Sequence, residues 1–239
     1  MMTPQAGGMI KRWVEGKGIR VVTGAGVERI EPGAGAPLSA TLSTGEMLDC
    51  DLLIVAAGVA PNIAFLEGTA VHVAKGVLVD DTMQTSVPGI YAAGDVAEAP
   101  DLFSGRHLVA AIQPNAVDQA RVAAINMAGT SQGKARMKGV LAINVLDSLG
   151  MISSSFGEWQ GVPGGAGVEQ ADEAAGRYLS LQFSGDVLVG ATAIGWTEHV
   201  GVLRGLIQSK VRLGRWKDIL LGAPTRFVEA YLACHRPAS

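Results

Sequence analysis

The segment Gly89-Ile-Tyr-Ala-Ala-Gly-Asp95 limits the folds open to this chain. Its pattern predicts a short strand that ends in small residues, followed by a glycine that allows a tight turn and by an acidic residue. In open α/β sheets, ligands bind beyond the carboxyl ends of the strands, where a carboxylate can accept hydrogen bonds from sugar or polyol hydroxyls. Further along, Gln113-Pro-Asn-Ala116 predicts a helix start, whose unpaired N–H groups and positive dipole end favour a site that develops negative charge.

Composition places the chain among globular proteins. Hydrophobic residues make up 48% of the 239 residues and charged residues 17%, so the chain can bury cores and is not expected to be disordered. Its 32 glycines indicate many tight turns and close backbone approaches. The net charge is −3 and no basic patch stands out, which argues against a nucleic-acid or anionic-membrane partner.

Nothing in the sequence predicts export or membrane insertion. The longest apolar run, Leu52 to Ala60, is less than half of what a membrane-spanning helix requires. The first residues lack the charged-then-apolar layout of a secretory signal. Cys50 and Cys234 are far apart and form no Cys-x-x-Cys pair, so we expect no disulfide and a reducing, cytoplasmic setting.

Residues 1–58 predict a helix, a strand, an antiparallel pair and a buried strand. Thr3 is the expected N-cap and Pro4 the first residue of a helix that ends near Gly18. The segments expected after this helix are a strand at Ile19 to Thr23, alternating strands at Val27 to Glu31 and Leu38 to Leu42, a turn at Ser43 to Glu46, and a strand buried on both faces at Asp51 to Gly58.

Residues 59–135 and 136–239 form two further blocks, with the polar stretch Thr130 to Lys134 as the expected boundary. In the first block we expect strands at Val77 to Asp80 and Ile90 to Ala93, and a helix at Pro114 to Ala128 with a small-residue face. The second block changes from strands to helices, which predicts a separate α+β domain. Its expected strands are Val140 to Leu146, Ser154 to Trp159, Arg177 to Phe183 and Val187 to Ile194, its expected helices are His199 to Gln208, Arg215 to Leu221 and Pro224 to Ala233, and Gly161 to Gly167 is an expected glycine-rich loop.

Three segments resemble the two-dinucleotide-fold flavoproteins, which include rubredoxin and ferredoxin reductases, NADH oxidases and the flavin part of assimilatory nitrite reductases. They are Asp51-Leu-Leu-Ile-Val-Ala-Ala-Gly-Val-Ala-Pro-Asn62, Met83-Gln-Thr-Ser-Val-Pro-Gly-Ile-Tyr-Ala-Ala-Gly-Asp-Val-Ala97 and Gln113-Pro-Asn-Ala-Val-Asp-Gln-Ala120. The resemblance implies an α/β, partial glutathione-reductase-like fold followed by a C-terminal α+β domain. Residues 1–58 would be the C-terminal part of the NAD(P) domain, 59–135 the distal part of the FAD domain, and 136–239 the dimerisation or interface domain.

The same resemblance implies which residues would hold the cofactor FAD, with NAD(P)H as the substrate. They are Gly94, Asp95, Val96, Pro114, Asn115 and Ala116. Asp95 would accept a hydrogen bond from the ribitol chain of FAD. N–H groups near Asn115 and Ala116 would face the pyrimidine edge of the flavin and stabilise its reduced, anionic form. Taken without the resemblance, the same residues also allow a plain strand–turn with a capping aspartate and a plain helix start.

The family's two Gly-x-Gly-x-x-Gly fingerprints, one for FAD and one for NAD(P), do not occur in this sequence. Gly24-Ala-Gly26 has two of the three glycines, but it leads into the alternating run at Val27, so we interpret it as part of a hairpin. Two hypotheses remain. In the first, the chain is the C-terminal segment or a split subunit of an NAD(P)H-dependent FAD oxidoreductase that reduces an acceptor such as a small iron–sulfur protein and needs the missing N-terminal half. In the second, it is a non-catalytic scaffold that no longer binds nucleotide.

Association with another chain is expected under both hypotheses. The C-terminal domain, residues 137–239, would form a homo-oligomer or partner interface. The strands at Ile19 to Thr23 and Leu52 to Ala57 would have unpaired edges that favour aggregation or a complementary subunit.

The remaining candidates carry weaker signals. Cys50 is expected to be a small core residue, with a redox role as the alternative, and Cys234 has no partner cysteine. Glu198 with His199 is interpreted as a helix-capping arrangement, with an acid–base pair as the alternative. Trp159 and Trp196 are expected to pack the last domain's sheet, with an interface role as the alternative. The four histidines, His72, His107, His199 and His235, show no metal-ligand spacing.

Overall fold

The computed structural model of the chain describes residues 2–129, 133–196 and 198–234. These residues form two compact units, one made of the described residues up to 12 together with those from 60 onward, and the other of residues 13–59. His235 of the sequence analysis lies outside the described residues, as does most of the expected boundary at 130–134.

The first helix, α1 (Pro4–Glu15), forms where the sequence predicts it. The hydroxyl of Thr3 accepts a hydrogen bond from the N–H of Ala6 at 3.3 Å, which is the expected N-cap. Gly18, with φ +88°, donates its N–H to the carbonyl of Glu15. A left-handed residue therefore follows this helix end, as expected for a glycine there.

The smaller unit contains an antiparallel three-stranded meander. Its strands are β1 (Val27–Pro32), β2 (Leu38–Leu42) and β3 (Met47–Cys50), paired in the order β1-β2-β3. The predicted turn between β2 and β3 is present, because the carbonyl of Leu42 accepts the N–H of Gly45 at 2.8 Å. Gly24-Ala-Gly26 leads directly into β1, which confirms that it belongs to a hairpin and opens no helix.

Two strands expected in this unit do not form. The segments Ile19 to Thr23 and Asp51 to Gly58 pair with no strand among the described residues. Leu52, Ile54 and Val55 are 73%, 78% and 77% exposed, where the sequence predicted burial on both faces. A buried parallel strand needs hydrogen-bonded neighbours and covering helices, and the apolar composition of one segment cannot supply them.

The middle block packs α2 (Gln113–Ala128) beside a small sheet. The sheet contains β4 (Val77–Leu78), β5 (Ala97–Pro100) and β6 (His107–Val109), with β4 and β5 parallel. The expected strand at Ile90 to Ala93 is wrong, because only an isolated bridge joins Tyr91 to Gln84. The 3₁₀ turns η1 (Ala64–Leu66) and η2 (Gly94–Val96) complete the block.

Helix α2 buries only Ala123 of the small-residue face predicted for it, which consists of Ala116, Ala120, Ala123, Ala124 and Met127. Its buried residues are Asn115, Gln119 and Ala123, whereas Ala120 and Ala124 are exposed. The buried side chains of Asn115 and Gln119 form hydrogen bonds with segments distant in the sequence. Because their polar groups have partners, this face can be buried in place of the alanine face.

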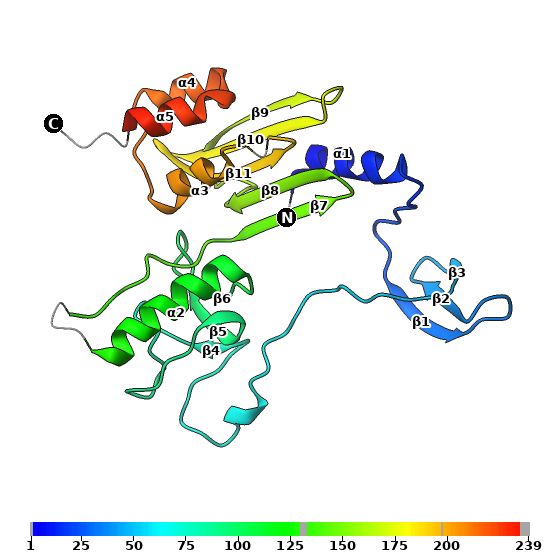
Figure 1. Cartoon of the computed structure of the whole chain (residues 1–239), viewed down its shortest axis with the longest axis horizontal. Helices are drawn as coiled ribbons and strands as arrows, with labels where there is room; N and C mark the ends of the chain where they lie inside the picture. Colours follow the sequence, from blue (N-terminus) through cyan, green and yellow to red (C-terminus); the bar gives the residue numbers. More distant parts are fainter. Residues whose placement is uncertain (1, 130–132, 197, 235–239) are drawn as a thin grey trace. The chain divides into compact units, whose positions relative to one another are not determined.

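The last block is an antiparallel sheet with three helices on it (Figure 1). Its strands, in the order β7-β8-β11-β10-β9, are β7 (Ile143–Ser148), β8 (Met151–Gly157), β9 (Ala166–Asp172), β10 (Arg177–Ser184) and β11 (Val187–Ile194). The helices are α3 (Val200–Gln208), α4 (Trp216–Gly222) and α5 (Phe227–Cys234), the last preceded by the 3₁₀ turn η3 (Pro224–Arg226). The predicted α+β character is confirmed. Strand β9 was missed because it is a mostly exposed edge strand that follows a glycine-rich loop, so it lacks apolar alternation.

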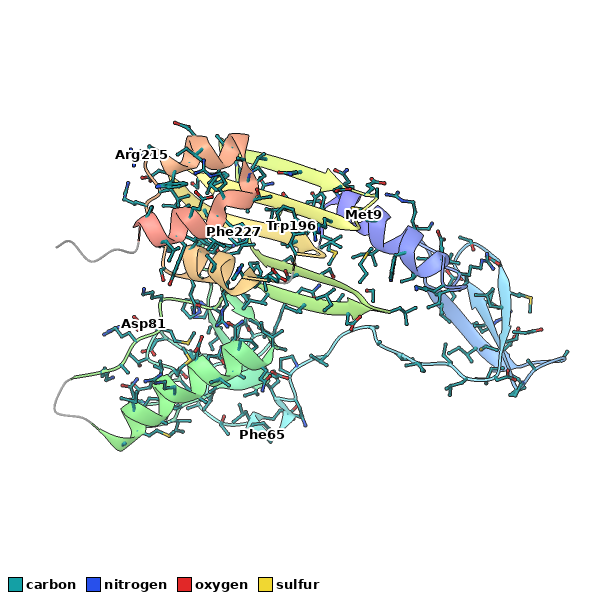
Figure 2. The ribbon with its side chains drawn as sticks, turned by 45° about the horizontal axis from the view of Figure 1, so that its top comes forward. Met9, Phe65, Asp81, Trp196, Arg215 and Phe227 are labelled. Carbon is teal, nitrogen blue, oxygen red and sulfur yellow. The ribbon has the colours of Figure 1, made fainter. Side chains whose placement is uncertain are left out.

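The two faces of this sheet have different partners. On one face, Leu179 and Leu181 of β10 join Leu203 and Leu206 of α3 in the main core. The adjacent residue Tyr178 lies on the opposite face, because strand side chains alternate. There Tyr178 and Ile194 pack against Ala6 and Met9 of α1, and the Thr3 hydroxyl lies 2.6 Å from the Tyr178 hydroxyl. Figure 2 labels Met9 on α1.

Candidate functional site

The turn η2 presents the acidic residue of the sequence motif to solvent. Ala93 is extended, with φ −150°, and Gly94 turns the chain with φ +82°. Asp95 follows with an exposed side chain, and the N–H of Ala97 closes the turn on the carbonyl of Gly94. A positive φ is free of steric cost only for glycine, so Gly94 determines where the Asp95 carboxylate lies.

Helix α2 begins beside this turn without a side-chain cap. Its N-cap residue Ile112 is extended, and Pro114 sits in the first turn, where a missing N–H costs nothing. The N–H of Ala116 already donates to the carbonyl of Ile112 at 3.1 Å. The backbone N–H groups of Gln113 and Asn115 therefore have no acceptor within the helix, and Pro114 between them has no N–H.

Gln119 joins the turn to the helix. The N–H of Gly94 donates to Oε1 of Gln119 at 2.7 Å, and a Cβ added to Gly94 would lie 3.8 Å from Cβ of Ala116. All six predicted residues, Gly94, Asp95, Val96, Pro114, Asn115 and Ala116, therefore belong to two segments that the structure brings together. Gln119 was missed as a functional candidate. Its spacing of four residues from Asn115 placed it on the same helix face.

Asn115 is 2% exposed, and its side chain binds backbone groups of the last block. Its Nδ2 donates to the carbonyl of Leu141 at 2.9 Å, and its Oδ1 accepts the N–H of Leu141 at 3.4 Å. The side chain thus anchors the start of α2, which leaves only its backbone N–H for a ligand. Its predicted role as a flavin contact stays a prediction.

A second contact joins α2 to the C-terminal domain. Arg204 of α3 donates to Asp118 of α2 at 3.3 Å, with both side chains partly exposed. Solvent screening limits the free energy that such a pair contributes. Together with the Asn115–Leu141 bonds, it holds the first two turns of α2 against the C-terminal domain.

The groups at this corner fit part of a flavin. An exposed carboxylate on a glycine turn suits polyol hydroxyls, and a helix start with unpaired N–H groups suits an electron-rich ring edge. Gln119, 1% exposed, also has a buried Nε2 without a hydrogen-bond partner among the described residues. The ADP part of FAD requires a glycine-rich fingerprint that the 239 residues do not contain.

The other chemical candidates do not come together. Cys50 and Cys234 are both free and half-buried, and burial raises the pKa of the Cys234 thiol. In the part of the chain that the structure describes, no group of three or more His, Cys, Asp and Glu side chains could hold a metal ion. Within the same described ranges, no helix has the length and apolar composition needed to cross a membrane.

Known proteins of similar sequence are longer than the part that this chain matches. A search of the curated proteins finds the NADH-dependent phenylglyoxylate dehydrogenase subunit epsilon of Aromatoleum evansii, 38% identical over 210 residues, which are 87% of this chain and 49% of that protein. It also finds the rubredoxin-NAD(+) reductase of Pseudomonas putida, 35% identical over 55% of this chain and 34% of that protein. The chain thus spans about half the length, or less, of the curated relatives it matches.

Among solved structures, the covalent putidaredoxin reductase–putidaredoxin complex has the same fold. Its TM-score is 0.81 over 99% of this chain and 55% of that one, at 19% identity. The likeness confirms the partial two-dinucleotide-domain fold predicted from the sequence. The family model for pyridine nucleotide-disulphide oxidoreductases matches residues 1–124. Because this match covers more than half of the 239 residues, the chain belongs to the pyridine nucleotide-disulphide oxidoreductase family.

Proposed function

We propose that this chain forms the C-terminal half of an NAD(P)H-dependent FAD oxidoreductase that reduces an acceptor such as a small redox protein. The observation that carries the proposal is the Gly94–Gln119 hydrogen bond, which holds the turn bearing Asp95 against the start of α2. These are the two segments that resemble the distal flavin-binding half of the family.

The chain's own residues would bind and orient the cofactor. FAD is the cofactor of this family, as in the FAD-dependent pyridine nucleotide-disulphide oxidoreductase of Desulfovibrio vulgaris, and it transfers electrons from the pyridine nucleotide to an acceptor. Asp95 would accept a hydrogen bond from the ribitol chain, and Gly94 would let the backbone approach closely. The N–H of Asn115 and the positive end of the α2 dipole would face the pyrimidine edge of the ring and favour its negative charge.

The phosphate-binding half of the site would come from residues outside these 239, either in the same polypeptide or in a second one. Two observations support this. The glycine-rich fingerprints are not in the sequence, and the aligned residues cover only 49% and 34% of the two relatives. The exposed Leu52, Ile54 and Val55 would become the buried strand that their composition predicts once neighbouring strands are present.

The acceptor and the assembly are further parts of the proposal. One relative is named for rubredoxin, and one structural neighbour was solved with putidaredoxin, both of which favour a small redox protein as acceptor. We place oligomer or partner contacts on residues 137–239. The two free cysteines favour a reducing, cytoplasmic setting.

The test is to purify the tagged chain with and without a polypeptide that carries both fingerprints, and to measure flavin absorbance and NADH oxidation with ferricyanide. We expect no flavin on the chain alone and one flavin per chain in the pair. In the pair, Asp95→Ala should weaken flavin binding about tenfold through the lost charged acceptor, whereas the exposed control Glu67→Ala should not change it. A chain that binds FAD stoichiometrically by itself contradicts the split site. A pair that never acquires flavin favours the scaffold hypothesis instead.

A further inference from the structure

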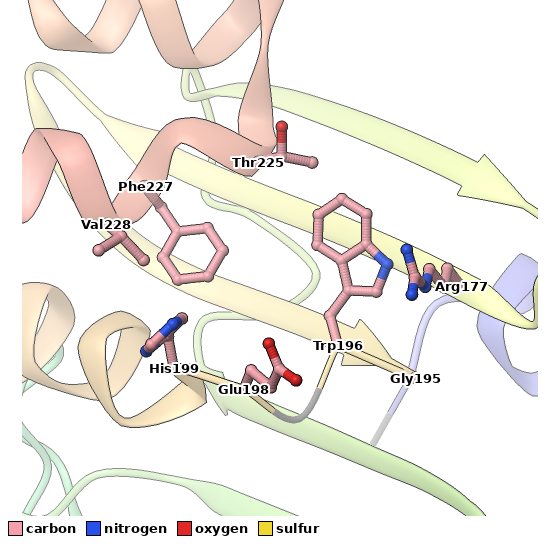
Figure 3. Close-up of a pocket in the computed structure, with 8 residues that line it drawn as sticks. All are labelled: Arg177, Gly195, Trp196, Glu198, His199, Thr225, Phe227 and Val228. Atoms are coloured by element: carbon pink, nitrogen blue, oxygen red, sulfur yellow. The ribbon is translucent and has the colours of Figure 1, made fainter.

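A cavity of about 280 Å³ lies in the C-terminal domain and shares no residue with the flavin corner. It opens between the end of β11, the start of α3 and the η3–α5 corner (Figure 3). The residues that decide its chemistry are Arg177, Trp196, Glu198, His199, Phe227 and Val228. His199 occupies the N-cap of α3, at the expected helix start, but its side chain forms no capping hydrogen bond with the helix.

Trp196 brings a buried donor to this cavity. Its indole Nε1 is buried and has no acceptor among the described residues. An indole N–H can only donate, and a buried donor without an acceptor costs free energy comparable to a lost hydrogen bond. A ligand oxygen that accepts from Nε1 would remove this cost.

Arg177 brings a second donor from the start of β10. Its side chain is exposed, and it forms no ion pair within the described ranges. Figure 3 shows the indole nitrogen of Trp196 turned toward the Arg177 guanidinium. Two donor-only groups that converge in this way match a ligand with two acceptor oxygens, and a guanidinium binds a carboxylate through two parallel hydrogen bonds.

The rest of the lining is mixed, because the polar residues His199 and Thr225 lie there beside apolar and acidic side chains. The Trp196 indole, Phe227 and Val228 form an apolar wall, which is typical of small-molecule sites in which a few polar groups fix the orientation. The Glu198 carboxylate lies on the same rim and would repel a second negative charge. A singly charged ligand with an apolar body therefore fits better than a compact, multiply charged anion.

We propose that this cavity binds a small organic carboxylate. Its two oxygens accept hydrogen bonds from Arg177 and from Nε1 of Trp196, and its apolar body lies along the indole toward Phe227. The proposal concerns the C-terminal domain alone, so it stands or falls independently of the flavin function.

The direct test is a titration of the ¹⁵N-labelled full chain with benzoate, acetate and inorganic phosphate, followed at the indole N–H resonances. Trp196→Phe assigns the resonance of Trp196. We expect benzoate to move this resonance downfield in a saturable way, and acetate to bind about tenfold more weakly because it lacks the apolar body. No saturable shift at millimolar benzoate overturns the site. Equal affinity for benzoate and phosphate overturns the organic ligand.

Matched variants test the two charges. Arg177→Gln should weaken benzoate binding about tenfold, and Arg177→Lys should restore part of it because the charge returns without the planar fork. Glu198→Gln should strengthen binding by removing a like charge. Arg121→Gln, an exposed arginine on α2, is the control and should leave the affinity unchanged. If Arg121→Gln weakens binding as much as Arg177→Gln, general charge attraction explains the effect and the assigned contact is wrong.

Discussion

The backbone N–H of Gly94 donates to Oε1 of Gln119 over 2.7 Å, across 25 residues of sequence. This bond connects a turn that only glycine adopts freely, with φ +82°, to a helix side chain that is 1% exposed. The bond orients the amide oxygen of Gln119 toward the turn and holds the turn that bears Asp95 against the helix.

Gln119→Met should remove this link while it keeps the side-chain volume. The lost hydrogen bond should lower the free energy of unfolding by about 1–2 kcal/mol, and amide exchange at Gly94 should become faster. Urea denaturation and hydrogen exchange measure the two effects. The exposed Gln113→Met in the same helix is the control and should change neither. Unchanged exchange at Gly94 would show that the turn is held in another way.

Asn115→Ala should detach the start of α2 from the C-terminal domain. The variant loses two hydrogen bonds to Leu141 and leaves buried backbone groups without a partner, which should cost about 2–3 kcal/mol. Chemical denaturation should give this loss, with faster amide exchange at Leu141. Asn62→Ala, at an exposed position, should stay within about 0.5 kcal/mol of the unmodified chain.

Tyr178 should make the stability of the chain depend on pH in alkaline solution. Burial raises the pKa of Tyr178 to about 12, whereas an unfolded tyrosine titrates near about 10. Between these values the unfolded chain releases a proton that the folded chain retains, so stability falls as the pH rises from about 10 to about 12.

Tyr178→Phe should abolish this alkaline loss, although it costs about 1 kcal/mol near neutral pH through the lost bond to Thr3. Urea midpoints measured across the alkaline range provide the comparison. Tyr91→Phe, which removes a half-buried hydroxyl elsewhere, should leave the alkaline slope as it is. A slope that survives in Tyr178→Phe would assign the titration to another group.

Ile54→Lys with Val55→Lys should reduce self-association of the isolated chain. Both side chains are more than 75% exposed on a segment of high apolar content, and added charge blocks edge pairing between chains. Light scattering at matched concentrations should report smaller particles. The same variant should fail to assemble with a complementary half, whereas Thr44→Lys in the β2–β3 turn should leave both properties unchanged. Equal scattering by all three chains would remove these residues from the self-association surface.

The elements that were predicted correctly depend mainly on residues that are close together in the sequence. Helix α1, with Thr3 at its start and Gly18 after its end, strands β2 and β11, and helix α2 are present within one or two residues of the predicted bounds. The predicted buried strand at Asp51 to Gly58 does not form, because it depends on more than local sequence. A strand buried on both faces needs neighbouring strands for its hydrogen bonds and helices against its faces, and none of the described residues supply them here.

The sequence by itself indicated the family and the residue types at the corner of Gly94, Asp95 and the start of α2, because a glycine turn, an acidic residue and a proline-led helix start are properties of short segments. Only the tertiary structure decided which groups hold these segments together. It assigned Gln119 to Gly94 and Asn115 to Leu141, and it turned Trp196 toward Arg177. The residues of each pair are distant in the sequence. Which of them come into contact depends on how the strands and helices pack, and a local sequence pattern does not contain this information.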